Sequence, residues 1–142
     1  MEQQKAPGLN AQNARIVHSA MLASIVAISL GLGVARSVTE VDFDGLVAQA
    51  VQIFALVQLV VVGVLVQKLK MAIPLCSAEG DANEWWRANG ARVMVTWALS
   101  EGTATLGAVA WLLTGEWAAL FVIGAALVLL LRLGPNSWHV YS

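Results

Sequence analysis

Long uncharged stretches separated by short polar segments give this chain its pattern. Apolar runs cover 16–35, 45–67, 93–115 and 117–131, and Glu101 is the single charge inside any of them. A helix crosses the hydrocarbon core of a bilayer with about 20 apolar residues, a length that the first three runs reach. The fourth run is shorter, and the basic residue after it can extend the span by placing its charge at the membrane surface. Because backbone groups in lipid must be hydrogen-bonded within their own segment, the pattern predicts an all-α integral membrane four-helix bundle that forms a single membrane domain.

Basic residues predict how this bundle is oriented. If both termini are cytoplasmic, seven of the eight Lys and Arg residues lie on the cytoplasmic side, and only Arg36 lies outside. Cytoplasmic segments of membrane proteins carry the excess of basic residues, so both termini and the loop at 68–92 are predicted to be cytoplasmic. Within that loop, Asp81 and Glu84 have the spacing of a capping box, which predicts a short helix beginning near Asp81. The expected location is a bacterial inner membrane.

Composition supports the same class and excludes several functions. Hydrophobic residues make up 58% of the chain and charged residues only 12%, whereas soluble domains carry about 25% charged residues. One cysteine and two histidines leave few ligands for a metal site, and no catalytic motif is present, so neither enzyme activity nor a cofactor is expected. The net charge of −1 gives no reason to expect nucleic acid. The expected partners are the lipid bilayer and other membrane subunits or further copies of this chain.

Glu101 lies near the middle of the third apolar run, where ionisable side chains are costly and are functional candidates. The depth of a side chain in the bilayer can be counted from the nearest cytoplasmic basic residue. On this count Glu101 and Ser24 each lie nine residues from such a residue, and Gln58 lies ten. The three side chains are therefore predicted to share one polar layer. Because no Lys or Arg occurs inside a predicted span, we expect a neutral Glu101 that donates a hydrogen bond to Gln58 or Ser24.

The segment Ala98-Leu99-Ser100-Glu101-Gly102-Thr103-Ala104, followed by Gly107, resembles the carboxylate-bearing helix of ATP synthase c subunits. In that family a midmembrane acid followed by small residues binds the translocated proton or sodium ion. The resemblance implies that Glu101 is an ion-binding acid with Ser100 and Thr105 as its neighbours. It covers one helix of the four and does not extend to the glycine-rich helix that precedes the acid in that family.

Small residues and tryptophans indicate how the helices pack and where they end. Small side chains let membrane helices approach closely, which predicts packing positions at Ala27, Gly31, Ala98, Gly102 and Gly107. Tryptophan favours the lipid headgroup region, which predicts cytoplasmic interface anchors at Trp85 and Trp86 and outer anchors at Trp111 and Trp117. His18 is also expected to be a polar residue at the interface.

Two hypotheses for function follow from these patterns. The first is a non-catalytic accessory or structural subunit of a larger membrane complex, in which the small-residue faces bind other helices. In this reading Glu101 clamps the bundle or faces a partner subunit. The alternative is a proteolipid-like subunit that translocates a proton or cation through Glu101. A Glu101→Gln substitution separates the two, because glutamine keeps the shape of the side chain but cannot carry a proton.

Overall fold

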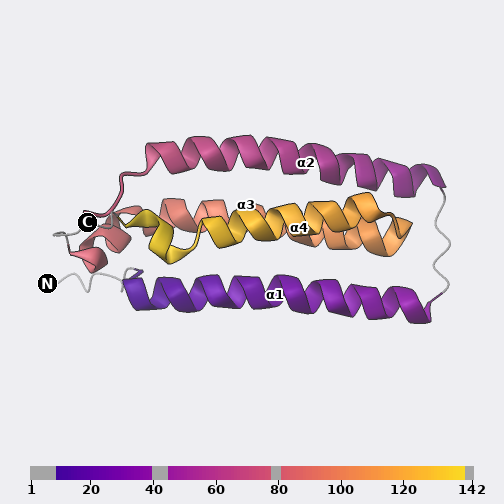
Figure 1. Ribbon diagram of the computed structural model, residues 1–142, viewed down its shortest axis with the longest axis horizontal. Helices are drawn as coiled ribbons and strands as arrows, with labels where there is room; N and C mark the ends of the chain where they lie inside the picture. Colours follow the sequence, from indigo (N-terminus) through magenta and orange to yellow (C-terminus); the bar gives the residue numbers. More distant parts are fainter. Residues whose placement is uncertain (1–8, 40–44, 78–80, 140–142) are drawn as a thin grey trace, which may run out of the picture.

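The protein is an all-α four-helix bundle, seen here in a computed structural model that describes residues 9–39, 45–77 and 81–139. The helices follow one another along the chain as the apolar runs predict (Figure 1). A single turn of 3₁₀ helix, η1, follows the last of them. The elements are α1 (Ala11–Val38), α2 (Gly45–Ala72), α3 (Ala82–Thr114), α4 (Trp117–Arg132) and η1 (Pro135–Trp138).

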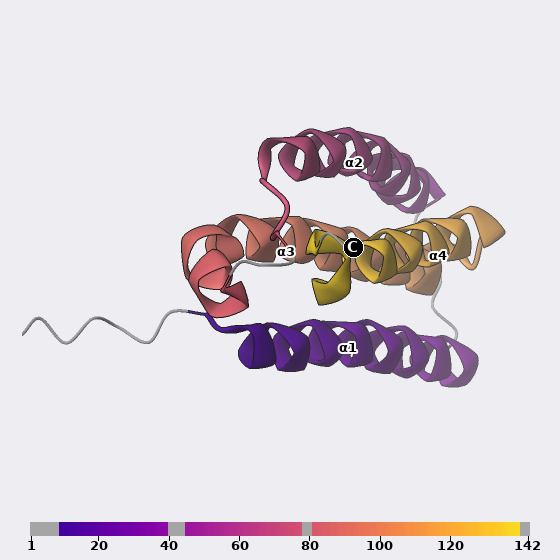
Figure 2. The same ribbon diagram turned by 60° about the vertical axis from the view of Figure 1, so that its left-hand side comes forward.

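The helix α3 is the centre of the bundle. Helices α1, α2 and α4 all pack on it, whereas α1 and α2 lie on opposite sides and have almost no contact with each other among the described residues. Figures 1 and 2 show this arrangement from two directions, with α1 and α2 flanking the α3–α4 pair. The start of α1, the end of α2 and η1 lie at one end, here called the η1 end. The opposite end holds the turn between α3 and α4 and is called the hairpin end.

Local sequence explains where the helices begin and end. The side chain of Asn10 accepts a hydrogen bond from the backbone N–H of Asn13 at 2.7 Å and caps the start of α1. Asp81 caps α3 in the same way through the N–H of Asn83 at 2.8 Å. Gly115 ends α3 with a φ of 68°, a left-handed conformation that glycine adopts without strain. These caps satisfy backbone groups that have no partner inside the helix.

A side chain from α1 completes the hairpin end. Arg36 Nη1 donates a hydrogen bond to the carbonyl of Leu112 at 2.6 Å, and the guanidinium lies against Gly115. The last carbonyls of a helix lack intrahelical partners and carry partial negative charge, which favours a cation at this position. Arg36 therefore fixes the position of α1 along the axis of α3.

The helix α3 starts earlier than the sequence pattern predicts. Residues 82–92 were expected in a cytoplasmic loop with one short helix, but they form the first turns of α3 without interruption. The capping residue is the expected one, Asp81. The charged residues 84, 87 and 92 do not end the helix, because they are compatible with helical backbone and lie on its exposed side.

Two of the helices, α1 and α2, are long and apolar enough to cross a membrane by length and composition. In the most apolar window of each, only 17% of the residues are buried inside the protein. The core helix of a soluble protein would bury most of such a window, so these apolar surfaces face outward. The helix α3 is not in this class because polar side chains interrupt its apolar run, and α4 has only 16 residues.

Candidate functional site

The predicted contact between Glu101 and Ser24 is present in the structure. The Ser24 hydroxyl of α1 is hydrogen-bonded to Glu101 Oε1 of α3, and both side chains are half-buried. The same hydroxyl oxygen lies 2.9 Å from the carbonyl of Met21, which can also accept its proton. The structure has this hydroxyl donating to Glu101 Oε1, the reverse of the predicted direction, so the carboxyl group and the carbonyl compete for its one proton. This pair is a polar link between α1 and α3 near the middle of the bundle.

Gln58 does not join this pair, in contrast to the predicted three-residue layer. Its Nε2 donates to Thr103 Oγ1 at 3.4 Å, a long contact. Thr103 and Glu101 are two residues apart, which turns their side chains about 200° from each other around a helix. Glu101 therefore faces α1 while Thr103 faces α2. Depth along the bundle was predicted correctly for Gln58, but its direction around α3 was not.

Ser100 and Thr105, the neighbours implied by the resemblance, do not form a cage around Glu101. Ser100 is fully buried, and its hydroxyl donates to the carbonyl of Thr96 at 2.9 Å within the same helix. Thr105 is half-buried, one turn beyond Glu101. Among the described residues there is no cluster of three or more His, Cys, Asp or Glu side chains that could hold a metal ion. The candidate ion-binding site consists of Glu101 and Ser24, and its function stays a prediction.

The small residues predicted to pack helices fall into two groups. A Cβ at Gly107 would lie 3.0 Å from Val122 and 3.2 Å from the backbone nitrogen of Ile123, so here α3 and α4 meet closely. The other four predicted packing residues are exposed, and a Cβ at either of the two glycines among them would have nothing within 4 Å. They are Ala27 and Gly31 on α1 and Ala98 and Gly102 on α3. Their predicted packing is thus not within this chain.

Tryptophans form a buried cluster at the η1 end of the bundle. Trp86 and Trp97 of α3 lie with ring centroids 5.9 Å apart, and Trp85 lies 5.1 Å from Trp86 and 6.2 Å from Trp138. The ring of His18, from α1, lies 4.9 Å from that of Trp97. Elements from both ends of the sequence therefore meet here around aromatic rings, which favour such tilted and edge-to-face arrangements.

This cluster changes the assignment of two residues that were expected at the lipid interface. Trp86 is only 1% exposed, so its ring belongs to the core and does not reach lipid headgroups. Trp85 is half-buried, and its indole N–H donates to the carbonyl of Pro74 at 2.9 Å. At the hairpin end, Trp111 packs its ring against Gly33 of α1, whereas Trp117 is 75% exposed and can act as an anchor.

Hydrogen bonds attach the end of α4 to the cluster. The indole N–H groups of Trp97 and Trp138 both donate to the carbonyl of Leu133, at 2.7 and 3.1 Å. His18 Nε2 lies 2.9 Å from the carbonyl of Leu130, and His18 is buried. His18 is thus a core residue and not the interfacial residue that was expected. A helix end in a bundle core needs such partners for its free carbonyls.

No protein-family model, no curated protein and no solved structure matches this chain. The similarity to ATP synthase c subunits accordingly rests on the segment around Glu101 alone.

Proposed function

We propose that this protein is a small, non-catalytic integral membrane protein that spans the bilayer four times and serves as an accessory or structural subunit of a larger membrane complex. Its outer surface supports the membrane location. Large apolar side chains such as Leu30 of α1, Val60 of α2 and Phe121 of α4 are each at least 58% exposed. Extended apolar surface of this kind is rare on soluble monomers and is suited to lipid.

The distribution of basic residues supports an orientation with both termini in the cytoplasm. Basic side chains occur at the η1 end on each of the four helices, whereas Arg36 lies at the hairpin end and caps α3. Membrane proteins keep such excess basic charge on the cytoplasmic side. The η1 end is therefore the proposed cytoplasmic end.

The observation that carries the subunit proposal is the uncovered small-residue face of α3. Ala98 and Gly102 are four residues apart on one exposed side of the central helix, and a Cβ at Gly102 would meet no atom within 4 Å. In lipid, helices associate where small residues allow their backbones to approach, and a pair spaced by four is the usual pattern. Gly31 on α1 is open in the same way. These positions can receive helices of another subunit.

Filling this face should release the protein from its complex without unfolding it. Gly102→Leu places a large side chain on the proposed contact, and Gly124→Leu on α4 is the matched control, because Gly124 is also exposed with nothing within 4 Å. After gentle detergent extraction of the tagged chain from its own membrane, native mass and identification of co-purified chains should show the wild type and Gly124→Leu in a larger assembly. Gly102→Leu should be recovered mostly alone. Wild type recovered alone, or equal release by both variants, contradicts the proposal.

A second candidate function, ion translocation, is favoured by the surroundings of Glu101. Its carboxyl is half-buried in the middle of α3, next in sequence to the exposed Gly102. A carboxyl group at that depth is costly unless it has a partner or a function. A neighbouring subunit on this face could complete an ion site that Glu101 and Ser24 begin.

Glu101→Gln tests this candidate in proteoliposomes with a trapped pH-sensitive dye. A carrier should lose nearly all of its proton flux while the assembly stays intact, because glutamine keeps a hydrogen-bonding group but has no proton to exchange. The matched control is Glu116→Gln, which removes an exposed acid at the hairpin end and should leave flux unchanged. Equal flux in wild type and Glu101→Gln contradicts ion translocation and leaves Glu101 as a structural clamp.

A further inference from the structure

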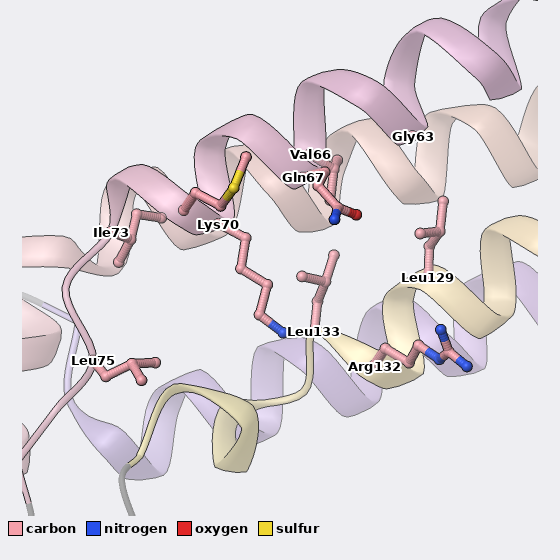
Figure 3. A pocket seen from close by; sticks show the side chains of 10 residues that line it. Gly63, Val66, Gln67, Lys70, Ile73, Leu75, Leu129, Arg132 and Leu133 are labelled. Carbon is pink, nitrogen blue, oxygen red and sulfur yellow. The ribbon is translucent and has the colours of Figure 1, made fainter.

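A cavity of about 530 Å³ opens between α2 and α4 at the η1 end (Figure 3). Its walls are apolar toward the middle of the bundle, where Gly63 and Val66 of α2 lie across from Leu129 of α4. The part of the cavity nearer the η1 end is formed by the C-terminal ends of α2 and α4. A cavity of this size can hold a small ligand or one part of a larger amphiphile.

The charged side chains of this cavity are both basic. Lys70 lies in the last turn of α2, and Figure 3 shows its side chain extending across the space between the helices. Arg132 ends α4 and lines the other wall, and in Figure 3 its guanidinium points away from the Lys70 amine, so it must change rotamer to reach a shared anion. No acidic side chain lines the cavity among the residues that the structure describes. The cavity is therefore complementary to an anion at its open end.

The position of the lysine amine is set by the tryptophan cluster. Lys70 Nζ lies 5.8 Å from the centroid of the Trp138 ring, within the range of a cation–π interaction. Trp138 is itself fully buried and hydrogen-bonded to Leu133, which also lines the cavity. The amine thus lies at the cavity, beside a buried aromatic ring of the core.

An apolar hollow on the surface of α2 continues from this cavity toward the middle of the helix. It has a volume of about 450 Å³ and shares Gly63, Gln67 and Met71 with the cavity. Beyond these shared residues, Leu59, Val60 and Val64 form its apolar wall, and Lys68 lies at its end toward the η1 end. Because a Cβ at Gly63 would meet nothing within 4 Å, the glycine leaves open space where the two hollows join.

We propose that this cavity binds an anionic phospholipid of the cytoplasmic leaflet. The phosphate is held by Lys70 and Arg132, and an acyl chain runs past Gly63 along the apolar hollow of α2. Basic pockets between helices on the cytoplasmic side are the sites at which membrane proteins select anionic headgroups. The inference rests on the membrane location proposed above, and it assigns a ligand to a surface that is separate from Glu101.

The test uses the purified full chain in a zwitterionic detergent, after carbonate washing has shown that the chain stays in the membrane fraction. Native mass spectrometry then measures the binding of added phosphatidylglycerol, phosphatidylcholine and inorganic phosphate. We expect phosphatidylglycerol to bind more tightly than phosphatidylcholine. Removing both charges in Lys70→Gln/Arg132→Gln should lower the affinity for phosphatidylglycerol roughly 30-fold, because each basic residue near the membrane surface contributes about 1 kcal/mol. Arg132→Gln alone, at an exposed position, should lower it about fivefold.

Two matched variants show whether phosphatidylglycerol binds in this cavity or responds only to the positive charge of the protein. Arg87→Gln/Arg92→Gln removes two exposed basic residues from α3 near the same end but outside the cavity, and it should leave binding unchanged. Gly63→Leu fills the junction of the hollows without changing charge and should weaken binding of the phospholipid. The proposal is overturned if both double variants weaken binding equally, if phosphatidylcholine binds as tightly, or if inorganic phosphate displaces phosphatidylglycerol. A chain that carbonate releases from the membrane refutes the proposed location instead.

Discussion

Replacing Trp97 with alanine should lower the free energy of unfolding by about 3 to 5 kcal/mol, the usual cost of removing a buried tryptophan side chain. Trp97 is completely buried, it contacts His18 of α1 and Trp86 of α3, and its indole N–H donates to Leu133 beyond α4. The substitution thus leaves a cavity where three parts of the chain meet. Denaturation of the detergent-solubilised protein, followed by far-ultraviolet circular dichroism, measures the loss.

Three control variants separate burial from hydrogen bonding in this prediction. Trp117→Ala removes a ring that is 75% exposed and should change the free energy of unfolding by less than about 0.5 kcal/mol. Trp97→Phe keeps an aromatic ring but loses the hydrogen bond to Leu133, whereas Trp86→Phe loses none, because the Trp86 indole N–H has no partner among the described residues. Trp97→Phe should therefore cost about 1 kcal/mol more than Trp86→Phe. Equal costs would show that the hydrogen bond contributes nothing.

Gly107→Leu should be strongly damaging where α3 meets α4, with a cost of about 3 kcal/mol. A Cβ alone would lie 3.0 Å from Val122, 3.1 Å from Ile123 Cγ1 and 3.2 Å from the backbone nitrogen of Ile123. A leucine adds three more carbon atoms, so α3 and α4 must separate along their contact, and overpacking of this kind costs about 1 to 3 kcal/mol or more. The loss is measured by the same denaturation of the isolated chain.

Gly102→Leu is the control on the same helix, five residues earlier. Since nothing lies within 4 Å of a Cβ at Gly102, the isolated chain should tolerate leucine there, and the better helix propensity should stabilise it by up to about 1 kcal/mol. If Gly102→Leu is harmless in the isolated chain but disrupts the assembly, the partner subunit contacts this face of α3. If Gly102 and Gly107 proved equally sensitive in the isolated chain, the assignment of α4 to the Gly107 side would be wrong.

The sequence predicts the helices better than it predicts what they contact. Uncharged runs locate all four helices, because uninterrupted apolar stretches of that length have few other structures. Charged residues 84, 87 and 92 were taken to mark a loop, although charge alone does not end a helix. Counting depth placed Ser24 beside Glu101 correctly. It could not place Gln58, because depth gives position along a helix and not the direction around it.

Tryptophan was the residue most easily misplaced from sequence. Its ring suits both the lipid interface and a buried core, so residue type alone does not decide between them. The available signal was spacing, since Trp86 and Trp97 are 11 residues apart, about three turns, and so share one face of α3. His18 lies at the same end by depth and completes that face. The apolar pattern did not indicate that Trp138 and η1 join the tryptophan cluster.

The central position of α3 has a consequence for biosynthesis. Because α1 and α2 pack on α3 and almost not on each other, the first half of the chain leaves the ribosome without an interface of its own. In the proposed membrane location, lone helices can stay in the bilayer individually, but their association must wait until α3 has been synthesised. Truncated chains that stop before residue 82 should therefore be unassembled substrates for membrane proteases, and the half-life of the nascent protein should depend on how soon α3 follows.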